Sequence, residues 1–333
     1  MKKVYFLGVD WFGSNDGAWI NALRMSNYIV KTVSHEKFLP NGKGNLFRVF
    51  SKTVRSIFFK QYNKAVLEEL RKFKPDLIFV FKGQFLYPET VERLSRLSIP
   101  TILIFPDTSI YEHGPFISKS FKYYTHVFST KKFHLKELAD KKGPSSKLNY
   151  LPHGFDLRVH RNLNLPKTIQ TSFVGTFSSY KGEVLSNLIK NKIDLKVFGN
   201  SWSKWSIKNR FNVELARYGD EYAEIICSSK INLALLYEGG SKSIAGDAIT
   251  SRTFHIPAAC GFMLHQRSEE LLNYFEEGKE IECFNGNEEL LDKIKFYLEN
   301  TNSREKIAKN GWLRANNEHG VHHRLRKLIN YLN

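Results

Sequence analysis

Short apolar runs alternate with longer amphipathic segments along the whole chain of 333 residues. Runs rich in Val, Ile, Leu, Phe and Tyr are typical of buried strands, whereas apolar residues three and four positions apart are typical of helices. We expect strands at residues 4–9, 76–81, 101–105, 126–129 and 148–151, and again at 171–175, 195–199, 231–236, 261–265 and 280–284. This alternation predicts an α/β protein with two doubly wound parallel sheets.

The two sets of strands predict two domains, because about 150 residues suffice to bury a full core. Between them the segment HGFDLRVHRNLNLPKTIQ has no periodicity and contains Pro166, which is typical of a linker. We therefore expect a Rossmann-like N-terminal domain at 1–155, a linker at 156–168 and a second Rossmann-like domain at 169–315. Residues 316–333 form a last helix that we expect to cross back to the N-terminal domain.

Cysteine content and hydropathy favour a cytoplasmic protein. Cys227, Cys260 and Cys283 are odd in number and lie in apolar patterns, which suggests neither a disulfide framework nor a zinc site. No segment approaches the roughly 20 apolar residues of a membrane span. The opening MKKVYFLGVD reads as a strand rather than a signal peptide, because Asp10 ends the apolar run.

The formal charge of +17 is concentrated in the N-terminal half. Residues 1–160 hold 26 Lys and Arg against 13 Asp and Glu, a net of +13, and the remainder holds 24 against 20, a net of +4. Such a field attracts an anionic partner. Nucleic acid is the least favoured partner, because the sequence contains no recognised DNA- or RNA-binding motif.

Residues 47–73 predict one long basic helix. Its apolar residues Phe47, Phe50, Val54, Ile57 and Phe58 lie near one side, with Arg48, Lys52, Arg55, Lys60 and Lys64 around them. A helix of this kind can lie on an anionic membrane surface. The alternative is a helix whose apolar side faces the core while its basic side is solvated.

Ligands of doubly wound sheets bind at the carboxyl ends of strands, so the loops after strands are the places to look for a site. The first loop, DWFGSNDGAW, has Gly13 and Gly17, which free the backbone, and Asp16 at the expected N-cap of a helix. It lacks the glycine spacing of a dinucleotide-binding fingerprint. Two interpretations of this loop therefore remain: it contacts a ligand, or it is an ordinary capped turn between a strand and a helix.

Two segments of the second half predict an anion site. In FVGTFSSYKGEVLSNL, Gly175 follows a strand and Lys181 lies near the start of a helix, whose free N–H groups favour anions. In GDAITSRTFHIPAAC, Arg252 could contact phosphate oxygens bidentately, and Ser251 or Thr253 could add hydroxyl donors. Each residue also has an alternative role. Lys181 could be solvated, Arg252 could pair with a local carboxylate, and His255 could pack on an apolar helix face.

These motifs resemble those of a known family. Paired Rossmann-like domains look like the GT-B fold of nucleotide-sugar glycosyltransferases. The segment from about residue 170 onward is similar to group 1 glycosyltransferases of the spore-protein CgeB-like type. That likeness rests on FVGTFSSYKGEVLSNL, LKVFG, SRTFHIPAACGFMLHQRSEELLNYFEEGKEIECF, NEELLDKIKFYLENTNSREKIAKNG and HGVHHR, with LPHGFD at the junction.

The resemblance implies roles for the donor-side residues. Lys181 and Arg252 would hold the donor diphosphate, and Asp247 would contact sugar hydroxyls. Retaining members of the class carry two glutamates separated by seven residues, whereas this chain has Asp247 and His255. Further donor contacts are expected from Gly175, Ser251 and Thr253, with Gly199 and Tyr237 lining the base pocket.

The resemblance also sets the chemistry of transfer. GT-B enzymes neutralise the leaving diphosphate with cations and helix N-termini, so neither a metal nor a cofactor is expected, the nucleotide-sugar being a co-substrate. The acceptor proton would pass to Asp16, to Asp107, or to the leaving phosphate itself. Gly13 and Gly17 would belong to the acceptor-side loop, and His153 would either face the acceptor or hold the linker.

We therefore expect a glycosyltransferase that moves a sugar from a nucleotide donor to an anionic glycan or lipid-linked acceptor, in bacterial cell-surface polysaccharide synthesis. It would work in the cytoplasm, or peripherally at the inner face of the membrane. The alternative is a non-catalytic glycan- or nucleotide-binding protein on a degenerate glycosyltransferase fold, which the missing second glutamate motivates.

Overall fold

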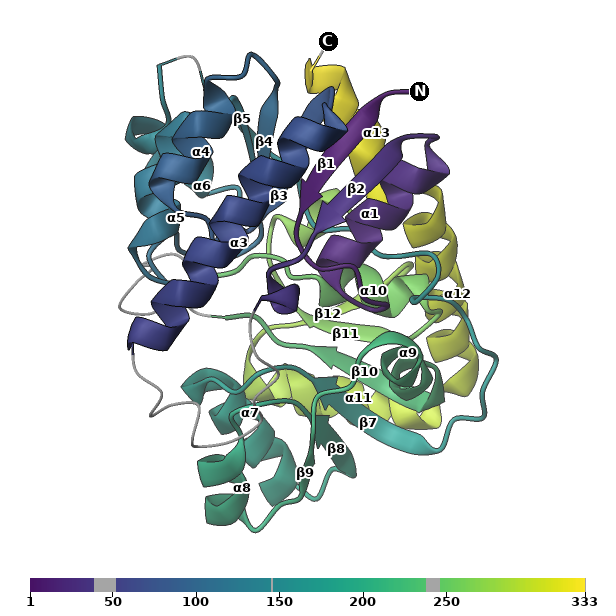
Figure 1. Cartoon of the computed structure of the whole chain (residues 1–333). Coiled ribbons are helices and arrows are strands. Elements are labelled where there is room, and N and C mark those ends of the chain that lie inside the picture. The colour runs from purple at the N-terminus through teal and green to yellow at the C-terminus, as the bar shows by residue number, and fades with distance from the viewer. Residues whose placement is uncertain (39–51, 145, 238–245, 333) are drawn as a thin grey trace. The chain divides into compact units, whose positions relative to one another are not determined.

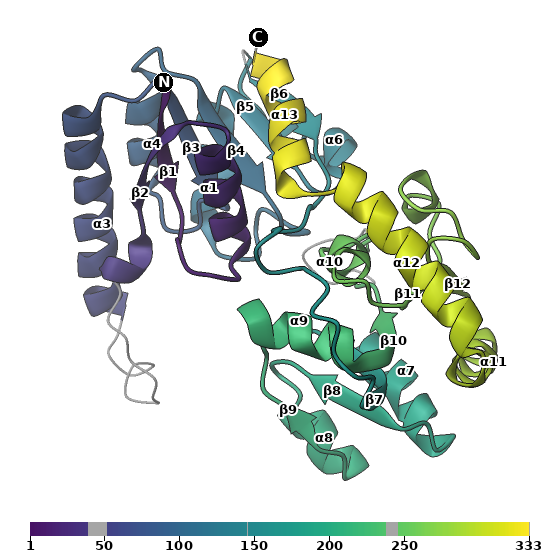
Figure 2. The same cartoon turned by 90° about the vertical axis from the view of Figure 1, so that its right-hand side faces the viewer.

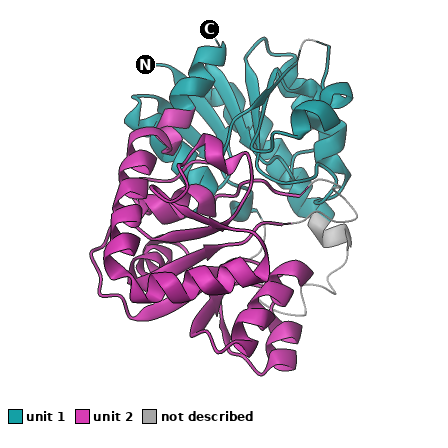
Figure 3. Cartoon of the chain, turned by 180° about the vertical axis from the view of Figure 1, so that it is seen from behind, with its two compact units in different colours: residues 1–152, 241–243, 325–333 teal, residues 153–240, 244–324 magenta. Residues whose placement is uncertain are grey.

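Two parallel sheets organise the described part of the chain (Figure 1). The computed structural model describes residues 1–38, 52–144, 146–237 and 246–332. Contacts divide the chain into unit 1, Met1–Pro152 with Leu325–Asn333, and unit 2, which begins at His153 and ends at Arg324 (Figure 3). The sequence places the first boundary at 155 and its last helix with the N-terminal domain.

Unit 1 contains a six-stranded sheet with the order β2-β1-β3-β4-β5-β6, in which every pairing is parallel. Its strands are β1 (Lys3–Leu7), β2 (Ile29–Val33), β3 (Leu77–Phe81), β4 (Thr101–Phe105), β5 (His126–Ser129) and β6 (Lys147–Tyr150). Its helices are α1 (Asn15–Met25), α3 (Lys52–Phe73), α4 (Pro88–Ser95), α5 (Pro115–Ser120) and α6 (His134–Glu137). The C-terminal helix α13 spans Val321–Leu332.

Unit 2 repeats this plan with the order β12-β11-β10-β7-β8-β9, again wholly parallel. Its strands are β7 (Ile169–Val174), β8 (Leu195–Phe198), β9 (Val213–Glu214), β10 (Ser229–Ala234), β11 (Met263–Gln266) and β12 (Glu282–Phe284). Its helices are α7 (Ser179–Lys190), α8 (Ser203–Asn209), α9 (Gly219–Ser228), α10 (Arg252–Ala258), α11 (Gly286–Glu299) and α12 (Thr301–Glu318). The two sheets confirm the predicted α/β class with two doubly wound units.

Two strands escaped the sequence prediction, and both lie at a sheet edge. β2 pairs only with β1, and its sequence IVKTV alternates between exposed and partly buried positions. β9 has two residues and pairs only with β8. An edge strand is half solvated and need not be an apolar run, so it lacks the pattern that identified the central strands.

The two faces of the unit 1 sheet are covered by different helices. Residues of α3, α4 and α5, among them Val66, Val91 and Ile117, pack with Tyr5 and Ile78 of the sheet in one core. Helix α1 lies on the opposite side of this sheet from α3 (Figure 2). The chain moves one way across the sheet from β1 to β2 and the other way from β2 to β3, so right-handed connections place the two helices on opposite faces. The central strands are thus buried on both faces, which explains their continuous apolar sequences.

The long basic helix is confirmed from Lys52 to Phe73, but its buried side differs from the predicted one. Tyr62, Val66 and Leu70 face the core, whereas Ile57 is 49% exposed. Residues 47–51 lie outside the described residues, as do the side chains of 52–55. The described part of the helix is therefore core-facing with a solvated basic side.

None of the helices in the described ranges combines the length and apolarity that a membrane crossing requires.

Candidate functional site

Arg252 opens α10 and lies at the carboxyl ends of two neighbouring strands of unit 2. Its Nη1 donates to the carbonyl oxygen of Val174 at 3.3 Å, and its Nη2 to that of Leu235 at 2.7 Å. The guanidinium also lies over the ring of Phe173, 5.4 Å from its centroid. Nε is buried and has no hydrogen-bond partner among the described residues. Arg252 thus brings a positive charge to the ends of β7 and β10. A bidentate contact with phosphate, as predicted, would use the N–H groups that these carbonyl oxygens leave over.

Lys181 brings a second cation to the same strand ends. It lies in the first turn of α7, whose N-cap Ser178 accepts the Lys181 backbone N–H, and its Nζ donates to the Thr176 carbonyl at 3.3 Å. The side chain is buried. Burial, together with the charge of Arg252, lowers the pKa of Lys181 to about 8, while Asp247 acts in the opposite direction. Two cations held together in a buried place favour an anionic ligand.

Glycine is required where the loops after β7 and β8 meet. A Cβ at Gly175 would lie 2.9 Å from Nη1 of Arg252, and one at Gly199 would overlap the carbonyl oxygen of Gly175. The indole Nε1 of Trp202 donates to that same oxygen at 2.8 Å. Gly199, predicted in the base pocket, therefore has a second role, which is to let the two loops approach each other.

Asp247 carries the carboxylate of this cluster. Its backbone N–H donates to the carbonyl oxygen of Tyr237 at 2.6 Å, and residues 238–245 lie outside the described residues. Both residues are partly exposed, as is Ser251 just before α10. The negative charge of Asp247 acts on Lys181 and on Arg252. We define the cationic cluster of unit 2 as Lys181, Arg252 and Asp247.

Two predicted donor contacts lie inside the protein instead. The Thr253 hydroxyl accepts the Thr250 backbone N–H at 3.0 Å and lies 2.8 Å from Nε2 of His265, and Thr253 is fully buried. The hydroxyl holds the start of α10 to β11, and its predicted role as a hydroxyl donor to phosphate stays a prediction.

His255 is a packed histidine. Its ring stacks on that of His160, with centroids 3.8 Å apart, and contacts Tyr222 edge-on. Burial, with the nearby His160, lowers its pKa well below the ordinary value, so the ring is neutral at physiological pH. His255 thus supplies no charge at this position, and its predicted donor contact stays a prediction.

His153 is the first residue of unit 2, whereas Gly13 and Gly17 belong to unit 1. Its carbonyl oxygen accepts a hydrogen bond from Nε of Arg324 at 3.0 Å, within unit 2. His153 thus lies at the start of the second unit, and its predicted role on the acceptor side stays a prediction.

The loop after β1 is held by Ser14. Its hydroxyl accepts the Gly17 N–H at 2.9 Å, so Ser14 is the N-cap of α1, and the prediction of Asp16 at this position is wrong. A Cβ at Gly17 would lie 2.7 Å from the Trp11 carbonyl oxygen. Gly13 has a φ of +97°, which glycine adopts without strain. Both glycines are needed for the turn itself.

Asp16 turns back towards the end of β1. Its Oδ2 accepts the Val9 N–H at 3.0 Å. Burial raises the pKa of Asp16 to about 6, although the hydrogen bond from Val9 and the charge of Lys82 oppose the shift. A carboxyl group with this pKa can accept a proton near neutral pH.

Asp107 follows β4 and is held by two basic groups. Its Oδ2 lies 3.0 Å from Nζ of Lys82 and 3.1 Å from Nε2 of His113. Burial alone would raise the pKa of Asp107, but the bonds from His113 and Lys82 lower it overall. Of the two predicted bases, Asp107 is thus the weaker proton acceptor.

An aromatic cavity beside Asp107 was not predicted from the sequence. It has a volume of about 800 Å³ and is bounded by the loops after β3 and β4 and by α3. Its walls include Phe59, Phe85, Tyr87 and Phe116, and His113 lies at its edge. The available signal was the aromatic pair Phe85 and Tyr87 directly after a strand, where ligands of such sheets bind.

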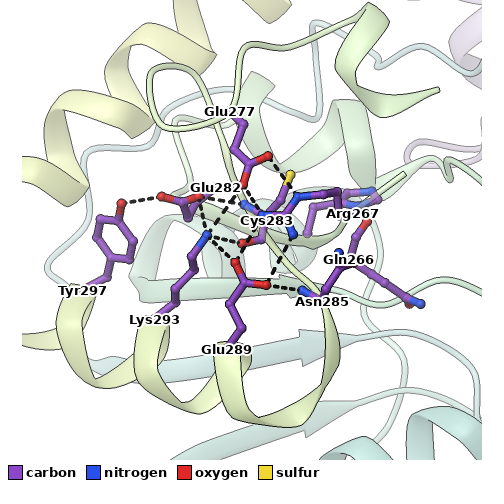
Figure 4. Close-up of polar contacts among 10 residues, drawn as sticks. Gln266, Arg267, Glu277, Glu282, Cys283, Asn285, Glu289, Lys293 and Tyr297 are labelled. Atoms are coloured by element: carbon purple, nitrogen blue, oxygen red, sulfur yellow. Dashed lines mark hydrogen bonds and ion pairs between the residues drawn. The ribbon is translucent and has the colours of Figure 1, made fainter. Parts of the chain in front are cut away.

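A charged network of unit 2 was also missed (Figure 4). Arg267 pairs with Glu277 and, at 3.1 Å, with Glu289. Lys293 lies 2.9 Å from both Glu282 and Glu289. These residues join β11, β12 and α11, and they include part of the FEEGKE stretch on which the family resemblance rests. The network fixes the edge of the sheet rather than forming an open site.

The described residues contain no group of three or more His, Cys, Asp or Glu that could hold a metal ion.

Comparisons with known proteins bear on the family. Residues 182–330 match the family model described as glycosyl transferase-like. No curated protein sequence is significantly similar to the chain. The CgeB-like subfamily therefore stays a prediction.

Solved structures resemble the whole chain. Sucrose-phosphate synthase from Thermosynechococcus elongatus has a TM-score of 0.71 at 12% identity, covering 100% of this chain and 99% of that chain. A glycosyltransferase from Rickettsia africae has a TM-score of 0.64 at 13% identity, covering 99% and 97%. HepE of Anabaena, in complex with UDP and glucose, has a TM-score of 0.60 at 12% identity, covering 100% and 99%. The chain thus has the GT-B fold, and its residues 182–330 are similar to the glycosyl transferase-like family.

Proposed function

We propose that this protein is a glycosyltransferase that takes a sugar from a nucleotide diphosphate donor bound by unit 2. The observation that carries the proposal is the cationic cluster: the buried Lys181 and the half-buried Arg252 lie at the carboxyl ends of β7 and β10, next to Asp247. A diphosphate supplies the negative charge that two such cations favour. HepE of Anabaena, which shares the fold, is known in complex with UDP and with UDP-glucose, and this supports a nucleotide-sugar as ligand.

In the proposed reaction the bond between the anomeric carbon and the diphosphate oxygen breaks, and the acceptor oxygen forms a new bond to that carbon. Lys181, Arg252 and the N-terminus of α7 stabilise the negative charge that develops on the leaving diphosphate, without a metal or a cofactor. Asp247 contacts the sugar hydroxyls. The predicted contacts of Gly175, Gly199, Tyr237, Ser251 and His255 with the donor belong to the same proposal.

Unit 1 binds the acceptor in this proposal, and Asp16 takes the acceptor proton. Asp16 is preferred to Asp107 because burial raises the pKa of Asp16 to about 6, whereas His113 and Lys82 keep the Asp107 carboxyl ionised. The net charge of +13 on residues 1–160 suits an anionic glycan or a lipid-linked acceptor. Such acceptors belong to bacterial cell-surface polysaccharide synthesis at the cytoplasmic face of the membrane.

Donor binding is tested by thermal unfolding with UDP-, GDP-, dTDP- and CMP-linked sugars. A ligand at about 100 times its dissociation constant stabilises the folded state by roughly 2.7 kcal/mol. We expect one nucleotide class to raise the melting temperature of the wild type and to lose this effect in Lys181→Ala. The control Lys190→Ala, at the exposed end of the same helix, should respond like the wild type. Equal responses of both variants would contradict the proposed diphosphate site.

His255 favours a second candidate function, a non-catalytic nucleotide- or glycan-binding protein. This position would carry a glutamate in retaining relatives, and here the ring is buried and neutral. Release of free nucleotide from the stabilising nucleotide-sugar separates the two candidates. A glycosyltransferase hydrolyses its donor slowly or transfers it to added acceptor, whereas a binding protein returns the donor unchanged.

A further inference from the structure

A groove between α3 and α4 on unit 1 combines an apolar floor with a basic rim. The cavity has a volume of about 380 Å³. Leu67, Leu97 and Ile99 contribute to its floor, and Leu97 is 45% exposed. Arg71, Lys74 and Arg93 stand around it, and no acidic residue lines it. We call these six residues the α3–α4 groove.

The three cations of the groove lack carboxylate partners within the described ranges. Three acidic residues of the same two helices are paired elsewhere, among them Glu69, which lies 3.1 Å from Lys31, and Glu92, which lies 2.7 Å from Arg96. Glu68 pairs with Lys64 at 3.7 Å. Three like charges beside one apolar surface repel one another unless an anion lies between them.

A second cavity of about 380 Å³ adjoins the groove along the same two helices and shares Arg71 and Arg93 with it. It adds Lys60 and Lys64, together with the carboxylates of Glu68 and Glu89. The basic surface thus continues along the helix pair, while the part free of carboxylates is confined to the α3–α4 groove.

The groove lies away from the proposed acid–base residues. It involves Pro75 just before β3 and Ile99 just before β4, so it lies at the amino ends of the strands. Asp16 and Asp107 follow β1 and β4 and lie at the carboxyl ends. In doubly wound sheets substrates bind at the carboxyl ends of the strands, so the groove is not part of the proposed substrate site.

We propose that the α3–α4 groove binds an anionic lipid and thereby docks unit 1 on a negatively charged bilayer surface. The lipid phosphate lies between Arg71, Lys74 and Arg93, and the first acyl carbons contact Leu67, Leu97 and Ile99. Arginine side chains suit this position because their planar N–H groups match phosphate oxygens. Free phosphate or nucleic acid would contact the cations but leave the apolar floor in water, which disfavours both as ligands.

This docking surface differs from the membrane face predicted around Phe47 and Phe50, which lie outside the described residues. It also stands independently of the proposed transferase activity, because none of its residues belongs to the donor cluster or to the acid–base pair.

Co-sedimentation of the full chain with vesicles tests the proposal. Vesicles of phosphatidylcholine alone are compared with vesicles that also contain phosphatidylglycerol. We expect binding only to the anionic vesicles. The double variant Arg71→Gln with Arg93→Gln should bind them roughly 30-fold more weakly, since each cation near an anionic surface contributes about 1 kcal/mol, or about fivefold. Leu97→Asn should weaken binding while leaving the net charge unchanged.

The matched control is Lys204→Gln with Lys208→Gln, which removes the same charge from exposed positions on α8 of unit 2. It should bind anionic vesicles like the wild type. Equal losses in both double variants would overturn the proposal, because only net charge would then matter. Full competition by inorganic phosphate, or an unaffected Leu97→Asn, would indicate a simple anion site and overturn it as well.

Two further measurements separate this proposal from the others. Thermal unfolding of each variant shows whether it is folded. The melting-temperature response to nucleotide-sugar should be the same in the groove variants as in the wild type, so loss of lipid binding and loss of donor binding are distinguishable.

Discussion

At the scale of single residues, environment decides which of two similar carboxylates can act as a base. Asp16 and Asp107 both follow strands of one sheet, and the sequence offers both as proton acceptors. Asp107 lies against Lys82 and His113 and stays ionised, whereas Asp16 accepts a hydrogen bond from the Val9 N–H and has a pKa that its partial burial raises. A buried carboxylate without a cationic partner is the better proton acceptor near neutral pH.

Replacing Asp16 by Asn should separate activity from stability. We expect transfer to fall by about 10²–10⁴-fold, the usual contribution of a positioned base. In the wild type, activity should rise with pH through about 6, where Asp16 loses its proton. Steady-state transfer with the donor found by thermal unfolding measures both.

Stability should respond in the opposite sense. The folded-state pKa of Asp16 lies above the ordinary 3.8. The stabilisation that the protonated carboxyl group provides is therefore fully present below pH 3.8 and is lost as the pH rises through about 6. Asp16→Asn should therefore be at least as stable as the wild type at neutral pH in urea unfolding. Asp107→Asn serves as the comparison, and a larger activity loss there than in Asp16→Asn would make Asp107 the base.

Residue chemistry could be predicted from the sequence only in part. Lys181 and Arg252 were identified because cations near helix starts have a recognisable pattern, and both lie at strand ends. Thr253 has the same local pattern, yet its hydroxyl bonds His265, a partner 12 residues away. Which way a side chain points at a helix start depends on such distant partners, and local sequence does not contain them.

At the scale of elements, the central strands and the edge strands β6 and β12 were predictable, whereas the edge strands β2 and β9 were not. The runs at 76–81 and 101–105 are apolar because both faces of the sheet are covered, and they form β3 and β4. β2 has the sequence IVKTV, in which only Val33 is buried, because one of its sides lacks a neighbouring strand. The aromatic cavity was also missed: the sequence shows the pair Phe85 and Tyr87 after a strand, but the other walls come from separate segments.

The charged network that joins β11, β12 and α11 should stabilise this edge of unit 2. Glu289 accepts hydrogen bonds from Arg267, Lys293 and the Asn285 N–H, and these bonds lower its pKa to about 2. Because the side chain is partly exposed, we expect Glu289→Gln to cost only about 1 kcal/mol of unfolding free energy at neutral pH. Urea unfolding measures this, with Glu288→Gln as the control at an exposed neighbouring position.

The same network predicts a pH window. The folded-state pKa of Glu289 lies below the ordinary 4.5, so its contribution is present above 4.5 and is lost as the pH falls towards about 2. The difference in stability between wild type and Glu289→Gln should shrink over this range. A difference that stays constant down to the lower limit would mean that packing, rather than charge, is responsible.

At the scale of the whole molecule, two separate cores predict two unfolding events. Each unit has its own sheet and its own buried apolar cluster. Chains with two such units commonly depart from two-state unfolding. We expect differential scanning calorimetry to resolve two transitions, of which nucleotide-sugar raises only one.

In Lys181→Ala, nucleotide-sugar should no longer raise the melting temperature of that transition, and the two transitions should stay separate. A single transition that shifts as a whole with nucleotide-sugar would show that the units unfold together. Glu289→Gln provides an internal assignment, because it should lower only the transition of unit 2, to which the network belongs.

The hydrogen bond from Trp202 to Gly175 gives the protein an intrinsic optical reporter. The indole is almost fully buried, and its N–H bonds the loop next to Arg252. Trp205 stacks edge-on against it, with centroids 5.0 Å apart. Emission from this pair depends on the local field and on ring geometry, so occupation of the neighbouring anion site would change the fluorescence of the unlabelled chain. Ligand arrival could then be followed in real time in a stopped-flow instrument.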